Sequence, residues 1–188
     1  MGGGYAYPTR RTTSRKGDPT MTGSARRPAS PPSHSDARPL PRRSMAVCAL
    51  IGAALMAAVD EIVFHQILNW HHFYDRSTPA VGLLADGLLH TAELLGLVVG
   101  FVLYADLRRR GTLSPAHARA GLFLGLGGFQ LFDGIVDHKV LRLHQIRYGV
   151  DLLPYDLAWN VAGLVLLGIG AVLAVRAGRA PLSAEPAR

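Results

Sequence analysis

Cysteine is nearly absent from this sequence of 188 residues, in which Cys48 is the single example. One thiol excludes a disulfide framework within the chain, and it excludes a zinc or iron–sulfur site built from several thiolates. Aromatic residues make up 7% and charged residues 18% of the chain, whereas hydrophobic residues make up 49%. What has to be explained is therefore a strongly apolar chain with few charges.

The formal net charge of +7 belongs to the first 44 residues. These residues hold nine of the 20 bases and two of the 13 acids, so the remainder carries eleven of each and is neutral. Residues 1–44 are rich in Gly, Ser, Thr, Pro and Arg and almost lack aliphatic side chains, so we expect a disordered basic tail. Met21 and Met45 are alternative translation starts to Met1. Nucleic acid is not an expected partner, because the basic charge does not extend into the apolar part.

Four apolar stretches follow the tail, and each is long enough to cross a bilayer, which takes about 20 helical residues. They cover residues 45–69, 80–104, 118–139 and 155–175. Small residues four positions apart, such as Gly121 and Gly125, are typical of closely packed membrane helices. The sequence predicts an all-α integral membrane protein, with a four-helix transmembrane domain over residues 45–176 and a short C-terminal tail over residues 177–188.

The arginines near the helix ends predict the orientation. Arg108, Arg109 and Arg110 lie between the second and third stretches, and Arg176 and Arg179 follow the fourth, so both groups fall on the same side as the basic tail. Loops rich in Lys and Arg face the cytoplasm. We therefore expect a multi-pass protein in the lipid bilayer of the bacterial cytoplasmic (inner) membrane, with both termini cytoplasmic.

A polar pattern in the first stretch recurs in the third at an offset of 73. Asp60-Glu-Ile-Val-Phe-His65-Gln-Ile-Leu-Asn-Trp-His71 and Asp133-Gly-Ile-Val-Asp-His138-Lys-Val-Leu-Arg-Leu-His144 agree at six positions. The second stretch opens with Asp86-Gly-Leu-Leu-His90 and the fourth with Asp156-Leu-Ala-Trp-Asn160, which indicates two duplicated helical hairpins related by a pseudo-two-fold axis along the membrane normal. Gly134, Asn160 and Gly163 replace Glu61, His90 and Glu93, so one asymmetric site is expected rather than two equal ones.

The polar residues of all four stretches are predicted to gather at one depth, near the extracytoplasmic face. Ionisable groups in hydrocarbon are costly and normally face a partner in the bundle interior. Acids and imidazoles together suit a transition metal, namely zinc, iron, manganese or copper. His65, His90 and His138 are the expected first ligands, and Asp60, Asp86 and Asp133 are expected to bind the metal or orient its ligands. The remaining candidate ligands are Glu61, Glu93, Asp137, His71 and His144. For His71 and His144, a place in the interfacial aromatic belt is the alternative.

Four functions stay open on these residues. The first is metal handling or assembly of a respiratory complex, with respiratory or metal-handling membrane proteins as partners. The second is a haem-binding electron-transfer protein with histidine pairs as axial ligands. The third is a metal-dependent membrane hydrolase, which would make the chain an enzyme with Glu61 or Glu93 as general base. The fourth is a structural or interaction subunit with a polar core.

The quoted strings, together with Gly128-Phe-Gln130 and Leu141, resemble the signature of a bacterial membrane-protein family catalogued as domain of unknown function 2243. The resemblance covers residues 45–175. It implies an integral membrane protein with four helices, and it adds no catalytic role to the functions above.

Overall fold

The computed structural model describes residues 1–3 and 38–179. The chain divides into two units, residues 1–31 and 32–188, and the description below concerns the second. Most of the predicted basic tail and residues 180–188 of the predicted C-terminal tail lie outside the described residues.

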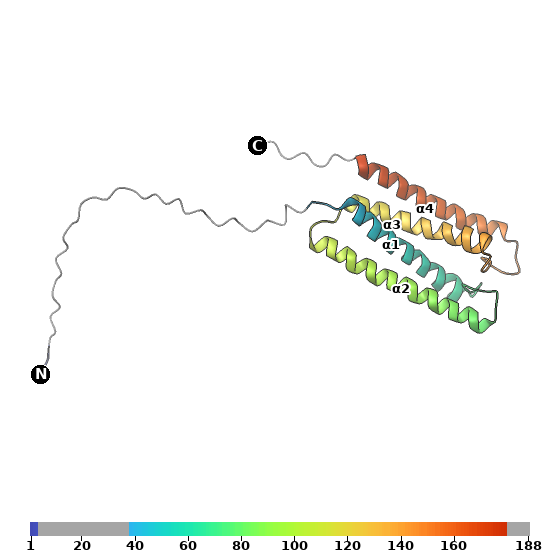
Figure 1. Ribbon diagram of the computed structural model, residues 1–188, viewed down its shortest axis with the longest axis horizontal. Coiled ribbons are helices and arrows are strands. Elements are labelled where there is room, and N and C mark those ends of the chain that lie inside the picture. Colours follow the sequence, from blue (N-terminus) through green and yellow to red (C-terminus); the bar gives the residue numbers. More distant parts are fainter. Residues whose placement is uncertain (4–37, 180–188) are drawn as a thin grey trace. The chain divides into compact units, whose positions relative to one another are not determined.

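Four long helices make up the described part of the chain (Figure 1). Helix α1, Pro41–Asp60, continues directly into a π-helical segment, η2, Glu61–Ile67, and α3, Pro115–Phe132, continues into η3, Asp133–Val140. Helices α2, Pro79–Arg109, and α4, Leu153–Arg179, are regular throughout. All four are long and apolar enough to cross a membrane, with mean hydropathy between 1.2 and 2.1. The predicted all-α fold with four apolar helices is confirmed, and the described ranges contain no strand.

Proline fixes the start of three of the helices. Pro41, Pro79 and Pro115 lie in the first turns of α1, α2 and α3, where the ring presets φ and the missing N–H costs no hydrogen bond. Helix α1 therefore begins four residues before the predicted start at Met45. The fully buried Ser44 fixes this extra turn, because its hydroxyl oxygen accepts a hydrogen bond of 2.9 Å from the backbone N–H of Ser114.

Helices α1 and α3 pack against each other at the centre, while α2 packs against α1 and α4 against α3 (Figure 1). The close approach of the central pair depends on glycine. A Cβ atom at Gly125 would lie 2.8 Å from the carbonyl carbon of Ala49 and 2.8 Å from the backbone nitrogen of Ala53. Gly121 faces the backbone of Met45 in the same way. These are the small residues that the sequence marks for membrane packing.

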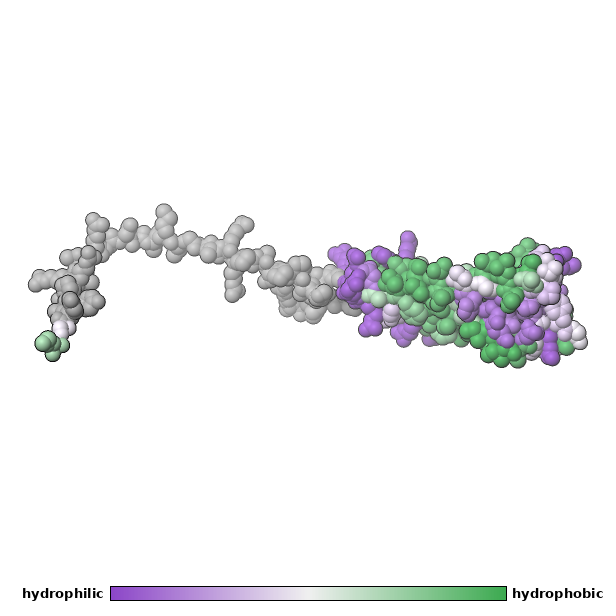
Figure 2. Space-filling view, turned by 90° about the horizontal axis from the view of Figure 1, so that it is seen from below, coloured by the Kyte–Doolittle hydropathy of each residue, from purple (hydrophilic) through white to green (hydrophobic). Residues whose placement is uncertain are grey.

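The outer faces of α2 and α4 are apolar and exposed. Leu83 is 62% exposed and Leu164 is 58% exposed, whereas the buried residues include twelve polar or charged side chains. Figure 2, which views the α2 side, shows broad hydrophobic surfaces between hydrophilic ends. This pattern, with apolar residues outside and polar residues inside, is the one expected of helices surrounded by lipid.

Both central helices end in the same way. Asn69 and Arg142, which lie 73 positions apart, have positive φ values of 47° and 52°. The backbone N–H groups of Leu68 and Leu141 donate to the carbonyls of Val63 and Val136 at 2.9 and 2.7 Å. We call the end of the bundle that holds η2, η3 and the loops 68–78 and 141–152 the distal end. Here the two loops turn back toward the helices. Short π-helical segments are rare in proteins as a whole, and those that occur are frequently found at functional sites.

Candidate metal centre

Three pairs of polar residues, each pair 73 positions apart, lie buried at the distal end. We call them the central cluster: Asp60 and Asp133, His65 and His138, His71 and His144. Each of the six is at most 4% exposed. The aspartates and the first two histidines come from the ends of the central helices and from η2 and η3, whereas His71 and His144 come from the loops that turn back. The structure therefore brings residues of both central helices and both loops into one place.

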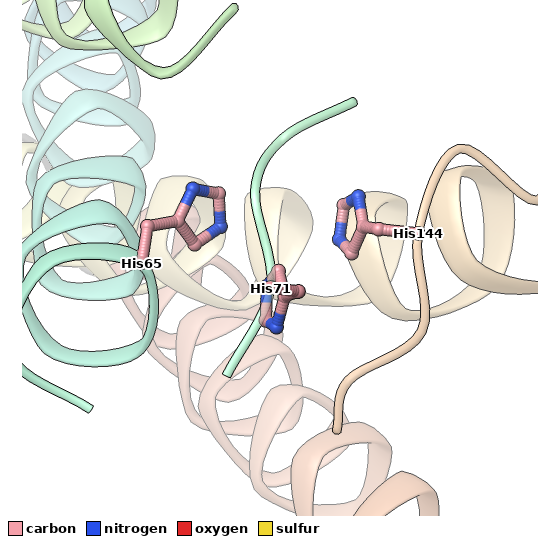
Figure 3. A group of neighbouring side chains, drawn as sticks. All are labelled: His65, His71 and His144. Carbon is pink, nitrogen blue, oxygen red and sulfur yellow. The ribbon is translucent and has the colours of Figure 1, made fainter. Parts of the chain in front are cut away.

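The four imidazole rings of the cluster are in close contact. The ring centroids of His65 and His71 are 4.4 Å apart, and those of His138 and His144 are 4.6 Å apart. His71 and His144 are stacked, with centroids 4.4 Å apart and planes inclined by 5°. Figure 3 shows His65 on its helical turn beside His71 and His144 on the two loops. Burial and the neighbouring imidazoles lower the pKa of His71 far below its usual range, so this ring is neutral at physiological pH.

Reciprocal hydrogen bonds to the backbone hold the two loop histidines. The Nδ1 atom of His71 lies 2.9 Å from the carbonyl oxygen of Ile146, and Nδ1 of His144 lies 3.0 Å from that of Phe73. Each histidine thus reaches the loop that carries the other, at positions that are again 73 apart. A carbonyl only accepts, so both Nδ1 atoms carry the proton and both Nε2 atoms carry the lone pair. This is the tautomer in which Nε2 binds a metal.

Two carboxylates fix the tautomer of His65 in the same way, with the proton on Nδ1. Its Nδ1 donates to Oδ1 of Asp86 at 3.1 Å and lies 2.7 Å from Oε2 of Glu61. The opposite nitrogen, Nε2, faces the cluster at 3.7 Å from Oδ2 of Asp60. Within the described residues, Nε2 of His65 and Nε2 of His71 are buried without a hydrogen-bond partner. Three of the four imidazoles therefore direct an Nε2 lone pair into the cluster.

His138 completes the cluster from η3. Its Nε2 lies 2.9 Å from Nε2 of His144 and 3.4 Å from Oδ2 of Asp133. The other oxygen of Asp133 lies 3.6 Å from Nε2 of His144. Two sets of donor atoms, from His65, His71 and His144 and from Asp133, His138 and His144, each lie within 4.8 Å of one another. Two ligands of one metal ion are separated by up to about 4 Å, because each bond is about 2.0–2.1 Å long.

Acids of the cluster pair with histidines and not with lysine or arginine. Across residues 38–179, the ion pairs of Asp60 and Asp133 are all with imidazoles, and so is that of the neighbouring Glu61. Lys139 is near the distal end, but it pairs with Asp156 on α4. The negative charge of Asp60 and Asp133 must therefore be neutralised by protonated imidazoles, by protonation of the carboxylates or by a bound cation.

Five predicted ligands lie outside the central cluster. Glu61 and Asp86 are buried beside His65, on its Nδ1 side, where they form a third set of donor atoms with it. His90 has a side chain that is 54% exposed, and its Nδ1 lies 2.7 Å from Oε1 of the buried Glu93. Asp137, also predicted, is 5% exposed and belongs to none of the three donor sets found in the described residues.

Sequence reasoning predicted Asp86 as a ligand or an orienting residue, but it missed the bonds of Asp86 to the loop and the carbonyls that hold the loop histidines. Asp86 accepts hydrogen bonds from the backbone N–H of Phe73 at 2.7 Å and from Nδ1 of His72 at 2.5 Å, besides the bond from His65. The backbone carbonyls of Phe73 and Ile146 could not be predicted from residue type, because every residue carries such a group. Their spacing of 73 is the one feature that sets them apart, and it is visible only after the histidine bonds are known.

The fold and the site define an all-helical membrane protein with a buried cluster of histidine and aspartate at one end of the bundle. The chain belongs to the family of predicted membrane proteins catalogued as domain of unknown function 2243, which matches residues 47–177. The resemblance seen in the sequence motifs is thereby confirmed. No curated protein and no solved structure matches the chain.

Proposed function

We propose that the protein binds a transition-metal ion in the central cluster and serves in metal handling or in the assembly of a respiratory complex. One observation carries the proposal: the Nδ1 atoms of three buried histidines are fixed by acceptors, so that their Nε2 lone pairs converge beside two carboxylates. Fixing one imidazole nitrogen from behind is how proteins orient histidine ligands.

The energetics of burial support a bound cation. A buried acceptor without a partner costs about 1–3 kcal/mol, and Nε2 of His65, Nε2 of His71 and Oδ2 of Asp133 are all in this position within the described chain. A single ion supplies a partner to several of these atoms at once. It also neutralises Asp60 and Asp133, whose ion pairs within residues 38–179 are with imidazoles and not with lysine or arginine.

The donor set narrows the class of metal. The cluster offers imidazole nitrogen and carboxylate oxygen. It offers no thiolate, because the single cysteine, Cys48, lies in α1 well before the first cluster residue. Such donors suit zinc, iron, manganese or cupric copper. Four nitrogens and two carboxylates exceed the four ligands of a tetrahedral structural zinc site, so the set fits best an ion that takes more than four ligands.

Haem fits the cluster less well than a bare ion. Two axial nitrogens on one haem iron face each other across the ring at about 4 Å, twice a metal–nitrogen bond. Nε2 of His138 and Nε2 of His144 are 2.9 Å apart, and the rings of His71 and His144 are stacked at 4.4 Å. No space for a flat macrocycle is left between either pair.

A hydrolase mechanism is less well supported for a similar reason. Glu61 lies against Nδ1 of His65 at 2.7 Å, on the side of the ring that faces away from the convergent lone pairs. A carboxylate in this place orients a ligand, whereas a general base must reach water bound at the metal. The remaining alternative, a structural subunit with a polar core, is the outcome of the test below if no metal binds.

In the predicted orientation the termini are cytoplasmic and the distal end is extracytoplasmic. The cluster would then lie near the extracytoplasmic face of the bacterial inner membrane. This placement agrees with the arginines of α2 and α4, Arg108, Arg109, Arg176 and Arg179, which lie in the last turns of these helices at the opposite end.

Elemental analysis of the purified full-length protein tests the proposal. Wild type and a His65→Ala/His138→Ala double variant are incubated with Zn²⁺, Fe²⁺, Mn²⁺ or Cu²⁺ and freed of unbound metal. The matched control is His117→Ala, since His117 bonds to Ser114 at the other end of the bundle. We expect about one ion per chain in wild type and control, and at least tenfold less in the double variant. Wild type without stoichiometric metal would overturn the proposal and leave the structural subunit as the better account.

A further inference from the structure

A cavity of about 390 Å³ opens beside the central cluster, between η2 and α2. We call it the α2 cavity; it is lined by Glu61, Gln66, Leu83, Asp86, Gly87 and His90. Its floor is acidic and buried, because Glu61 and Asp86 are each 1% exposed. Its rim is open, because Gln66, Leu83 and His90 are exposed. Figure 2 shows a hydrophilic patch between apolar surfaces on this face, toward the distal end.

The floor of the α2 cavity and the central cluster share one side chain. His65 directs Nε2 into the cluster, while Nδ1 faces Glu61 at 2.7 Å and Asp86 at 3.1 Å on the cavity side. Oε2 of Glu61 is buried against Nδ1 of His65, and Oε1 accepts a hydrogen bond of 2.7 Å from Nε2 of Gln66 at the rim. Glu61, His65 and Asp86 together present three donor atoms within 4.8 Å of one another. A second set of cation ligands thus lies one imidazole away from the first.

The corresponding place in the other half is closed and neutralised. Gly134 stands at the position of Glu61, and a Cβ atom there would lie 2.7 Å from Asn160 and from Trp159 on α4. Lys139, at the position of Gln66, forms an ion pair with Asp156, at the position of Asp86. Packing and a lysine thus remove in one half the space and the negative charge that the other half keeps.

We infer that the α2 cavity is a second, weaker site for a divalent transition-metal ion, and that the ion destined for the central cluster is loaded through it. The inference rests on the proposed function. The carboxylates of Glu61 and Asp86 hold the ion, with His90 and Glu93 as a further imidazole and carboxylate along α2. His90 lies eleven residues into α2, roughly 16 Å from its first residue, so the cavity extends from the distal end into the span.

Carboxylates make a suitable loading site. Oxygen donors bind borderline divalent ions less tightly than a set of imidazoles does, so an ion held by Glu61 and Asp86 is released to the neighbouring histidine cluster. The acids also attract the cation into a space that would otherwise repel it, because an uncompensated ion in an apolar environment is costly.

Two substitutions test the inference by introducing into the α2 cavity the residues found at the corresponding positions of the closed half. Gly87→Leu introduces the residue found at the corresponding Leu157, and a Cβ atom at Gly87 meets nothing within 4 Å. Gln66→Lys places a cation beside Asp86, as Lys139 is beside Asp156. The control is Gly168→Leu on α4, where a Cβ atom also meets nothing within 4 Å. None of the three residues belongs to the central cluster.

Metal-depleted protein in detergent is mixed with Zn²⁺, and uptake is followed with a zinc-responsive dye. Uptake by both variants should be at least tenfold slower than that of wild type and Gly168→Leu, with the same final content in the central cluster. An equilibrium titration should also lose the weaker of two binding phases in Gln66→Lys. Uptake at the wild-type rate in both variants would overturn the loading role and leave the central site intact, whereas absence of zinc from wild type would overturn the proposed function itself.

Discussion

Replacing Gly125 with alanine should separate the two central helices and weaken the metal centre. The Cβ atom would lie 2.8 Å from the backbone nitrogen of Ala53 and 2.8 Å from the carbonyl carbon of Ala49, whereas ordinary carbon contacts are about 3.5–4.0 Å. The atoms in the way belong to backbone, which cannot rotate aside as a side chain can. Helices α1 and α3 must therefore move apart by roughly 1 Å.

The magnitude follows from two opposed effects. Overpacking a close interface costs about 1–3 kcal/mol, while alanine favours a helix over glycine by about 1 kcal/mol. We therefore expect Gly125→Ala to lower the free energy of unfolding by up to about 2 kcal/mol. Gly168→Ala has the helical gain without the clash, since a Cβ atom at Gly168 meets nothing within 4 Å, and it should be neutral or stabilising by up to about 1 kcal/mol.

Denaturant titration in detergent micelles measures the two variants side by side, and metal affinity is measured on the same samples. Because α1 and α3 continue into η2 and η3, which carry His65 and His138, the separation should also lower the metal affinity of Gly125→Ala by at least tenfold. Equal stability of the two variants, or a more stable Gly125→Ala, would refute the assigned packing of the central pair.

Three further predictions follow from the site. Asp86→Ala removes the acceptor of Phe73 N–H and of two imidazoles and should destabilise the protein by about 3 kcal/mol or more; hydrogen exchange at the Phe73 amide should accelerate, and unchanged exchange would contradict the anchoring role. Burial holds the pKa of His71 below the value of about 6.5 in the unfolded chain, so the unfolded state takes up the proton first as the pH falls. Stability of the metal-free protein should therefore fall between pH 7 and pH 5, and the fall should be shallower in His71→Ala. Protein purified without added metal should show no Soret absorption, and a bis-histidine haem spectrum would favour the haem alternative.

The fold could be predicted from the sequence because hydropathy and helix length determine it. Four apolar stretches separated by turn residues permit little except four helices, and the starts at Pro41, Pro79 and Pro115 differ from the predicted ones by a few residues. The small-residue contacts were also accessible, since Gly121 and Gly125 lie on the face of α3 that meets α1. These features depend on local sequence and on the period of the helix.

The detailed site was less accessible because loops build half of it. His71 and His144 lie beyond the regular helices, and their inward position depends on positive φ values at Asn69 and Arg142 and on hydrogen bonds between the two loops. Neither feature follows from helical periodicity. The constant offset of 73 was the useful signal, because six of the eleven predicted ligands form three pairs at that offset, and these pairs make up the central cluster.

The helical stripe on α2 predicted more than the structure brings together. Asp86, His90 and Glu93 lie within a narrow arc at about 100° per residue, yet Asp86 and Glu93 are buried while the His90 side chain is 54% exposed. Helix α2 meets α1 along a narrow face of small residues such as Gly96 and Gly100, so a modest rotation decides which member of a stripe points inward. Periodicity defines an arc, and packing against the neighbour selects within it.

X-ray absorption spectroscopy of the metal-loaded protein tests the central claim most directly. The account predicts a first shell of nitrogen and oxygen atoms at about 2.0–2.2 Å, with the outer-shell scattering of at least three imidazoles. A His71→Ala/His144→Ala variant should lose the scattering of two imidazoles, and His117→Ala should retain the full pattern. A sulfur atom in the first shell, or a shell of oxygen atoms alone that both variants share, would contradict a metal centre built from the central cluster.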